Sequence, residues 1–218
     1  MTSSEAARPL RSDAVRSRKL LVEAAAAAFA EHGAAVSVSQ IAEQAGIGKG
    51  TVFRHFPTKE DLLAAIICES MYHLVAVGER LLQAEDPTEG LREFMGAAVE
   101  LQTKDRAFCQ VVHGEARGHP DVLKGQRELD AVTEALTDRA RRSGAIRADI
   151  TGQDVMLLMS GIYQTAAPQL AAQPQLWRRY LRLSFDGMQA VDAEDLPVPD
   201  ALTGPVAGGH AKAPDPGE

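Results

Sequence analysis

Hydrogen-bond donors are concentrated in a short stretch just after position 48. It contains Lys49, Thr51, Arg54, His55 and Lys59. Ammonium, guanidinium and hydroxyl groups donate to phosphate oxygens, and lysine and arginine also donate to the acceptor atoms of guanine in the major groove. We therefore interpret the stretch as a candidate surface for double-stranded DNA. The alternative is a basic helix face that contacts only water.

Small and apolar residues around these donors predict two crossing helices that would hold them in place. Ala42 is small where the helices must pass closely, and Gly46 stands at the turn, where a positive φ suits only glycine. The apolar wedge between the helices comprises Ile41, Ala45, Ile47, Val52 and Phe56. The positions left to face the groove are Lys49, Gly50, Thr51, Phe53, Arg54 and His55. This pattern predicts a helix-turn-helix over residues 37 to 56.

Residues 13 to 63 resemble the DNA-binding domain of the TetR family of transcriptional regulators. The positions that carry the resemblance are Gly46, Gly50-Thr51-Val52-Phe53, His55-Phe56 and Lys59. The family's fold implies base or phosphate contacts for Lys49 and Arg54. It implies phosphate contacts for Thr51 and His55, with simple packing as the alternative for His55. Lys59 would anchor the DNA backbone at the start of the following helix.

Two further positions complete the predicted contact set, and a third departs from the family pattern. Ser39 and Gln40 lie on the first of the two short helices, and Ser39 stands where some relatives have a base-reading arginine. Phe53 replaces the commoner tyrosine, so no hydroxyl is present to bond a phosphate. We expect Phe53 to pack or to contact a thymine methyl group.

Helical periodicity and caps predict an all-α fold of about nine helices. Asp13 can cap a helix over 14 to 32, Ser37 or Ser39 can cap a short one through 40 to 45, and another covers 48 to 55. Thr58, followed by Glu60 and Asp61, starts a helix that continues to about 82. The remaining predicted helices cover 88 to 103, 105 to 116, 120 to 142, 152 to 166 and 174 to 191. No run shows sustained alternation of apolar and polar residues, so we expect no β-sheet.

Four segments follow from this pattern. Residues 1 to 12 are polar and predict a flexible arm, and residues 13 to 63 form the helix-turn-helix domain. Residues 192 to 218 are rich in Pro, Gly and Ala and predict a disordered tail. For residues 64 to 191, the TetR resemblance implies a domain for ligand binding and dimerisation.

The second domain offers candidates for a small-molecule pocket and for a homodimer surface. The predicted pocket lining is Met71, Phe94, Met95, Phe108, Val112, His113, Tyr163 and Gln164, with ordinary core packing as the alternative for each. A mostly apolar stripe on the last two helices predicts a four-helix interface with a second copy, with an internal core face as the alternative. The stripe comprises Val155, Met156, Leu158, Met159, Ile162, Trp177, Tyr180, Leu181, Ser184, Phe185 and Met188.

Other chemistry finds little support in the sequence. His113, Glu115 and His119, with His73 one helix away, lack the tight spacing of metal ligands, so we expect no metal. Cys68 and Cys109 are interpreted as packing residues, with a redox switch as the alternative. No nucleophile with a base, cofactor fingerprint or carboxylate pair emerges, so we expect no enzyme and no cofactor; Glu115 and Asp121 near the two histidines come nearest.

Charge and hydropathy are consistent with a DNA-binding protein of the cytoplasm. The net charge is −7, but residues 1 to 60 hold 8 Lys and Arg against 6 Asp and Glu, while the remainder holds 15 against 24. A locally basic end can bind DNA because charges interact only over about 10 Å in salt. The apolar runs are too short for a membrane span, and Glu23 and Glu31 interrupt any secretory segment.

The sequence therefore predicts a homodimeric repressor that binds an inverted repeat in operator DNA. Ligand would favour a conformer in which the helix after Thr58 swings the two recognition helices out of register. Three alternatives stay open: a repressor that needs its ligand as corepressor, an effector-independent DNA-binding protein, and a helical-bundle enzyme.

Overall fold

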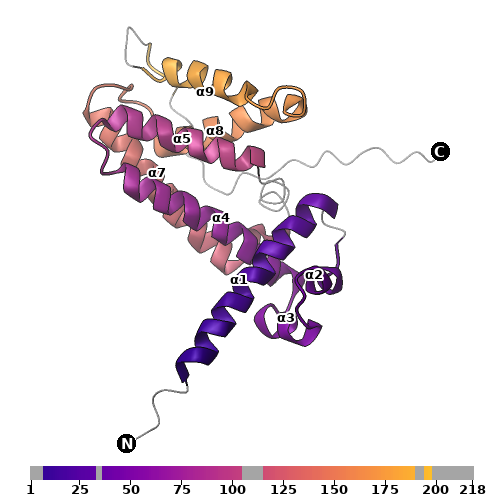
Figure 1. Cartoon of the computed structure of the whole chain (residues 1–218). Helices are drawn as coiled ribbons and strands as arrows, with labels where there is room; N and C mark the ends of the chain where they lie inside the picture. The colour runs from indigo at the N-terminus through magenta and orange to yellow at the C-terminus, as the bar shows by residue number, and fades with distance from the viewer. Residues whose placement is uncertain (1–6, 33–35, 105–114, 190–193, 198–218) are drawn as a thin grey trace, which may run out of the picture.

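The computed structural model describes residues 7–32, 36–104, 115–189 and 194–197, and its regular elements are all helical. These residues form eight α-helices, two short 3-10 turns and no strand, which confirms the predicted all-α class (Figure 1). The smaller part comprises α1 (Ala7–His32), α2 (Val38–Gln44) and α3 (Lys49–His55). The larger part comprises α4 (Lys59–Leu81), α5 (Pro87–Lys104), η2 (Glu115–Gly118), α7 (Pro120–Arg142), α8 (Gly152–Ala166), η3 (Ala167–Gln169) and α9 (Leu176–Gly187). The predicted DNA contacts lie on α2 and α3, except Lys59, which is the first residue of α4.

Helix boundaries differ from the predicted ones at both ends of the chain. α1 begins at Ala7, well before the expected start near residue 14, so residues 7 to 12 are helical and do not belong to an arm. Pro9 does not prevent this because it lies in the first turn, where a backbone N–H has no helical acceptor. α9 is shorter than the predicted 174 to 191. The predicted helix 105–116 falls almost wholly outside the described residues, as does the tail apart from 194–197, which has no regular structure.

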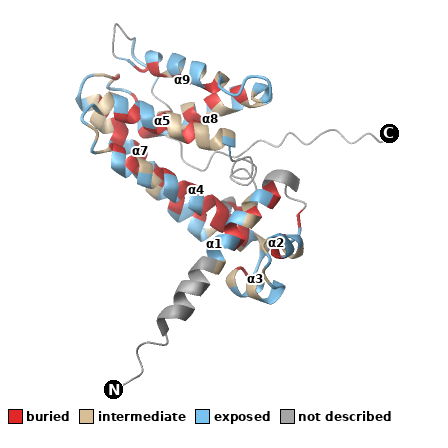
Figure 2. Ribbon diagram, in the orientation of Figure 1, coloured by how far each residue is buried: buried red, intermediate tan, exposed pale blue. Residues whose placement is uncertain are grey.

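The three N-terminal helices form one small core against the start of α4. α1 packs on α2 and α4, and α2 packs on α3. Figure 2 shows buried residues where these helices meet and exposed residues on the outer side of α3. The largest buried side chains of this core are Leu21, Phe29, Ile41, Phe56 and Leu62. α3 therefore packs on α2 and leads through a short turn into the beginning of α4.

α4 is the central helix of the molecule. By length and composition it could cross a membrane, but twelve of its residues are buried, and it packs against α1, α5 and α7. Burial inside the protein explains its apolar character, because a core helix of this length needs apolar residues on most sides. α4 thus connects the helix-turn-helix directly to the larger domain.

The corner between α7 and α8 is built around one close approach. A Cβ added to Gly152 would lie 2.7 Å from the Cα of Glu134 and 2.8 Å from its nitrogen. The Glu134 carboxylate accepts a hydrogen bond of 2.6 Å from the Gly152 N–H and an ion pair of 2.7 Å from Arg141. Thr151 and Asp154 add a capping box at the same helix start. Backbone contact and helix capping together fix the angle between α7 and α8.

Candidate nucleic-acid interface

The first short helix of the motif, α2, starts with a reciprocal cap. The Gln40 N–H donates to the Ser37 hydroxyl at 3.3 Å, and the Ser37 N–H donates to the Gln40 side-chain oxygen at 2.9 Å. Of the two predicted caps, the structure selects Ser37, and Ser39 becomes a half-buried residue of the first turn. Gln40 is exposed, but its side-chain oxygen is engaged in holding the helix start. Its predicted contact with DNA would compete with this cap.

The turn between α2 and α3 has the geometry that the glycine predicted. Gly46 adopts φ +64°, the left-handed conformation that costs side-chain-bearing residues roughly 1–2 kcal/mol. The Ile47 N–H donates 3.0 Å to the Ala42 carbonyl and closes the end of α2. Ile41, Ala42 and Val52 are buried where the two helices cross. The predicted wedge thus forms, with Ala45 and Ile47 packed at its edge.

α3 presents one fully exposed face. Lys49, Gly50, Phe53 and Arg54 are exposed at helical positions that lie side by side, while Val52 on the opposite face is buried. Phe53 is 48% exposed, which is unusual for so large an apolar ring. No atom lies within 4 Å of a Cβ built on Gly50. The four residues form one exposed helix face with two cations (Lys49 and Arg54), one aromatic ring (Phe53) and a glycine without a side chain (Gly50).

Thr51, His55 and Lys59 lie beside this face and are half-buried. The His55 ring lies 6.3 Å from the Phe56 ring, so packing, the alternative for His55, is part of its role. The Lys59 ammonium lies 5.5 Å above the Phe29 ring of α1. Such a cation–π contact places Lys59 at the junction of α4 and α1.

The start of α4 is fixed by a second capping box and by a contact that joins the two domains. The Thr58 N–H and hydroxyl donate to Asp61 at 2.9 and 2.7 Å, and these bonds hold the pKa of Asp61 below its usual range. The other Asp61 oxygen lies 3.3 Å from Nε2 of His119, the residue that caps α7. His119 adds to the lowering of the Asp61 pKa. These two residues are 58 positions apart, and no sequence pattern predicts their contact.

A cleft of about 730 Å³ lies where the two domains meet, beside this pair. Its walls come from α1, the α3–α4 turn, α4 and the start of α7, and include Arg18, His55, Cys68 and His119. The Arg18 guanidinium lies 5.1 Å above the Phe56 ring. Burial raises the pKa of the Cys68 thiol, with the nearby Asp121 carboxylate adding to the rise, so the thiol stays protonated at neutral pH.

Comparisons with known proteins agree with this geometry over most of the chain. Residues 21–66 match the family model for bacterial regulatory proteins of the tetR family, and residues 86–190 match the C-terminal domain of SbtR-like transcriptional regulators. The fatty acid metabolism regulator protein of Bacillus subtilis is 42% identical over 155 residues, which cover 66% of this chain and 77% of that protein. The chain belongs to the TetR family.

Two further relatives extend the comparison. The transcriptional repressor Rv1474c of Mycobacterium tuberculosis is 30% identical over 61% of this chain and 71% of its own length. A crystal structure of a TetR transcription regulatory protein from Mycobacterium vanbaalenii superimposes with a TM-score of 0.62 at 29% identity, covering 83% of this chain and 99% of that one. Matches to several other curated TetR-type regulators span only about a third of those proteins' length.

The structure describes five of the eight residues predicted to line a TetR-type ligand pocket. Met71, Phe94 and Met95 are buried in the core, where apolar side chains pack against one another. Tyr163 is half-buried, and Gln164 is exposed and donates to the Ser160 hydroxyl at 3.3 Å. Phe108, Val112 and His113 lie outside the described residues. Burial of the first three is shared by core packing and by the lining of an enclosed pocket, so the pocket stays a prediction.

Most of the stripe predicted as a TetR-type dimer surface faces the interior of its own protomer. The buried members are Val155, Met159, Ile162, Trp177, Leu181, Phe185 and Met188. Their apolar character is explained by the packing of α8 and α9 on α5 and on each other, so these seven do not form an exposed surface. Met156, Leu158, Tyr180 and Ser184 are half-buried. The exposed apolar residues of these helices are Leu157 and Leu183, which the prediction did not include.

The described residues hold no group of three or more His, Cys, Asp or Glu side chains that could bind a metal ion. His119, one of the histidines considered as metal ligands, caps α7, since its Nδ1 accepts a hydrogen bond of 3.2 Å from the Asp121 backbone N–H. The relatives reported above are regulators.

Proposed function

We propose that this chain is a transcriptional repressor that binds operator DNA through α3. The observation that carries the proposal is the exposed face of Lys49, Gly50, Phe53 and Arg54 on a helix whose orientation is fixed by the Gly46 turn. The two cations suit guanine or phosphate oxygens, and the Phe53 ring suits a thymine methyl group. Close approach of the Gly50 backbone to the DNA meets no obstacle from a side chain.

A homodimer supplies the second half of the recognition. Two-fold-related copies of α3 would occupy successive major grooves, roughly 34 Å apart, on an inverted repeat. The exposed sides of α8 and α9, with Leu157 and Leu183, are the dimer surface in this proposal. Membership of the TetR family supports both the dimer and the cytoplasmic location that operator binding requires.

A small molecule would release the operator by favouring a conformer with a different spacing between the two α3 helices. Such regulation requires that the effector bind the two conformers with unequal affinity. The Asp61–His119 contact is one point at which α7 touches the start of α4 directly, and it supports coupling between effector and operator.

The experiment is footprinting on DNA flanking the gene, with wild type beside the Lys49→Ala/Arg54→Ala variant. The control is Arg80→Ala/Arg92→Ala, which removes the same charge from exposed side chains on α4 and α5, remote from α3. We expect a protected inverted repeat with wild type and control, and none with the α3 variant. If wild type protects no site there and selection from random DNA returns no motif, the proposal is wrong.

Salt dependence separates contacts to phosphate from contacts to bases. Each phosphate contact contributes about 0.9 to the slope of log affinity against log salt, so a dimer that loses both cations from each copy could lose up to about 3.6. A smaller loss of slope with a large loss of affinity assigns one or both residues to bases. The control variant should keep the wild-type slope.

A further inference from the structure

The chain returns to the dimer side of the molecule after α9, and two charged residues hold it there. The Leu196 N–H donates 3.0 Å to the Asp149 carboxylate. Arg147 donates to the same carboxylate at 2.8 Å and also to the Glu194 carbonyl oxygen. The Arg147 N–H donates 2.9 Å to the Met188 carbonyl, which ties the α7–α8 loop to the end of α9. We call residues 194–197 the strap.

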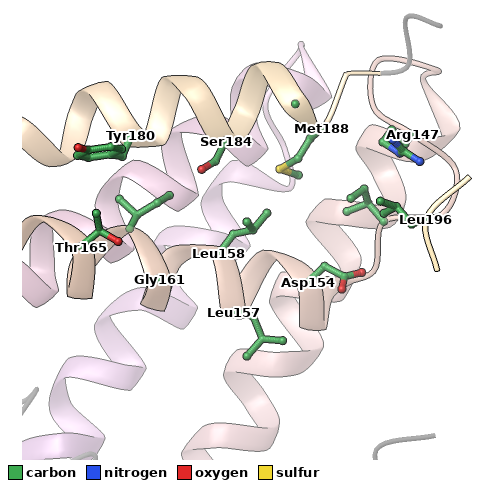
Figure 3. Close-up of a pocket in the computed structure, with 13 residues that line it drawn as sticks. Arg147, Asp154, Leu157, Leu158, Gly161, Thr165, Tyr180, Ser184, Met188 and Leu196 are labelled. Atoms are coloured by element: carbon green, nitrogen blue, oxygen red, sulfur yellow. The ribbon is translucent and has the colours of Figure 1, made fainter. Parts of the chain in front are cut away.

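The strap lies at one end of an open groove of about 580 Å³ between α8 and α9 (Figure 3). Figure 3 shows Leu196 and Arg147 at the end near Asp154, and Thr165 and Tyr180 toward the other end. Leu157, Leu158 and Leu196 are among the residues that line the groove. Leu196 is 41% exposed, although its backbone is held by Asp149. An ordered and exposed leucine is thereby added to an apolar surface.

The shape of α8 favours a second copy of this chain as the occupant. Gly161 lies within α8, is exposed, and has no atom within 4 Å of where its Cβ would be. A glycine there costs the helix roughly 0.5–1 kcal/mol and gives the single protomer no packing in return. Leu157 lies one turn earlier and is 52% exposed. Antiparallel crossing of two α8 helices about a two-fold axis would set each Leu157 into the gap at Gly161 of the second copy, which makes the face self-complementary.

We infer that the strap is part of the dimer surface, with Leu196 packing on the α8 of a second copy. The inference rests on the proposed homodimer and extends its interface beyond the two helices. In the antiparallel crossing, the Asp154 end of one α8 meets the Thr165 end of the other. Leu196, beside the Asp154 end, therefore faces the Thr165 end of the second copy. Arg147 and Asp149 act as positioning residues that hold the strap in this place.

Truncation of the full chain tests the inference by sedimentation equilibrium. Deletion of 194–218 removes the strap with the tail, and deletion of 198–218 removes the tail alone. We expect the first to weaken the dimer by about tenfold or more, since two leucines leave the interface, and the second to change the dimer Kd less than about twofold. Equal dimer Kd values for both deletions and wild type would overturn the inference. So would a tighter dimer after deletion of 194–218, which would mean that the strap covers the groove within its own protomer.

Point variants test the Leu196 side chain and the Asp149 carboxylate that holds the strap independently of each other. Leu196→Ser and Asp149→Ala should each weaken the dimer by about fivefold or more, the second by freeing the strap. The matched control is Glu89→Ala, which breaks an exposed ion pair with Arg92 on α5. Far-UV circular dichroism checks that each variant is folded; Leu196→Ser tests the inference even if Asp149→Ala does not fold. A wild-type dimer Kd in both variants would overturn it.

Failure of the inference is distinguishable from failure of the proposed function. Leu157→Arg tests the α8 surface without touching the strap. If Leu157→Arg yields monomers and wild type protects an operator, while loss of the strap has no effect, the strap inference alone is wrong. If wild type is monomeric at all concentrations, the dimer proposal is wrong and the inference falls with it.

Discussion

Replacement of His119 tests whether the two domains are joined where α7 meets the start of α4. Nδ1 of His119 accepts from the Asp121 N–H at 3.2 Å, which leaves the ring proton on Nε2 to bond Asp61 at 3.3 Å. Asparagine is as good an N-cap as any residue, but its side chain is too short to reach Asp61. His119→Asn therefore keeps the cap and loses the contact between domains, whereas His119→Ala loses both.

The structure sets the size of each effect. A hydrogen bond contributes about 0.5–1.5 kcal/mol net, and this one belongs at the low end, at about 0.5 kcal/mol, because it is long and partly exposed. The two side chains are 17% and 34% exposed. Loss of an N-cap adds about 1 kcal/mol. In urea unfolding, we expect His119→Asn to lose about 0.5 kcal/mol and His119→Ala about 1.5 kcal/mol.

A double-mutant cycle with Asp61→Asn isolates the contact from the capping box that Asp61 shares with Thr58. If the double variant loses the sum of the two single losses to within about 0.3 kcal/mol, the two residues are not coupled and the reasoning is refuted. The operator affinity of the same proteins supplies the functional test. An unchanged operator Kd in His119→Asn would remove the contact from any role in orienting α3.

Three further outcomes follow from the described geometry. Gly152→Ala should destabilise the protein by about 1–3 kcal/mol in urea unfolding, because the added methyl group meets the Glu134 backbone. A variant as stable as wild type would contradict this, because α7 and α8 would then have moved apart at no cost. Gly46→Ala should cost about 1–2 kcal/mol through its positive φ, and operator binding should weaken as the α2–α3 angle changes; an operator Kd equal to that of wild type would contradict this. Because the folded-state pKa of Asp61 is lowered, its stabilisation is complete above about pH 4 and is lost as the pH falls through the lowered value. Stability measured between about pH 5 and 2 should therefore fall less in Asp61→Asn than in wild type.

The helix-turn-helix was predictable from the sequence because its determinants are local. Gly46 sets a turn through its own φ, and Ser37 with Gln40 forms a cap within four residues of chain. The sequence offered Ser37 and Ser39 as equivalent caps, since both precede the same apolar run. The structure decides between them through the bond that only Ser37 makes with Gln40.

The larger domain was harder to predict because apolar periodicity identifies a buried face without identifying what buries it. Trp177, Leu181 and Phe185 repeat as an interface stripe would, yet their own protomer covers them. The same limit applies to Met71 and Phe94, since core and pocket linings share one composition. Contacts between distant residues, such as Asp61 with His119, leave no periodic signal at all.

The close contact of Gly152 with Glu134 has a geometric consequence for operator choice. α8 carries the proposed dimer face, and α7 packs on α4, whose first turn follows the recognition helix. In the proposed dimer, the α7–α8 angle would therefore determine the orientation of α3 relative to the two-fold axis. Any change in that angle occurs twice in a symmetric dimer, once on each side. In the proposed dimer, a protomer with a wider α7–α8 angle would prefer half-sites at a different separation, so Gly152 would contribute to the choice of operator spacing.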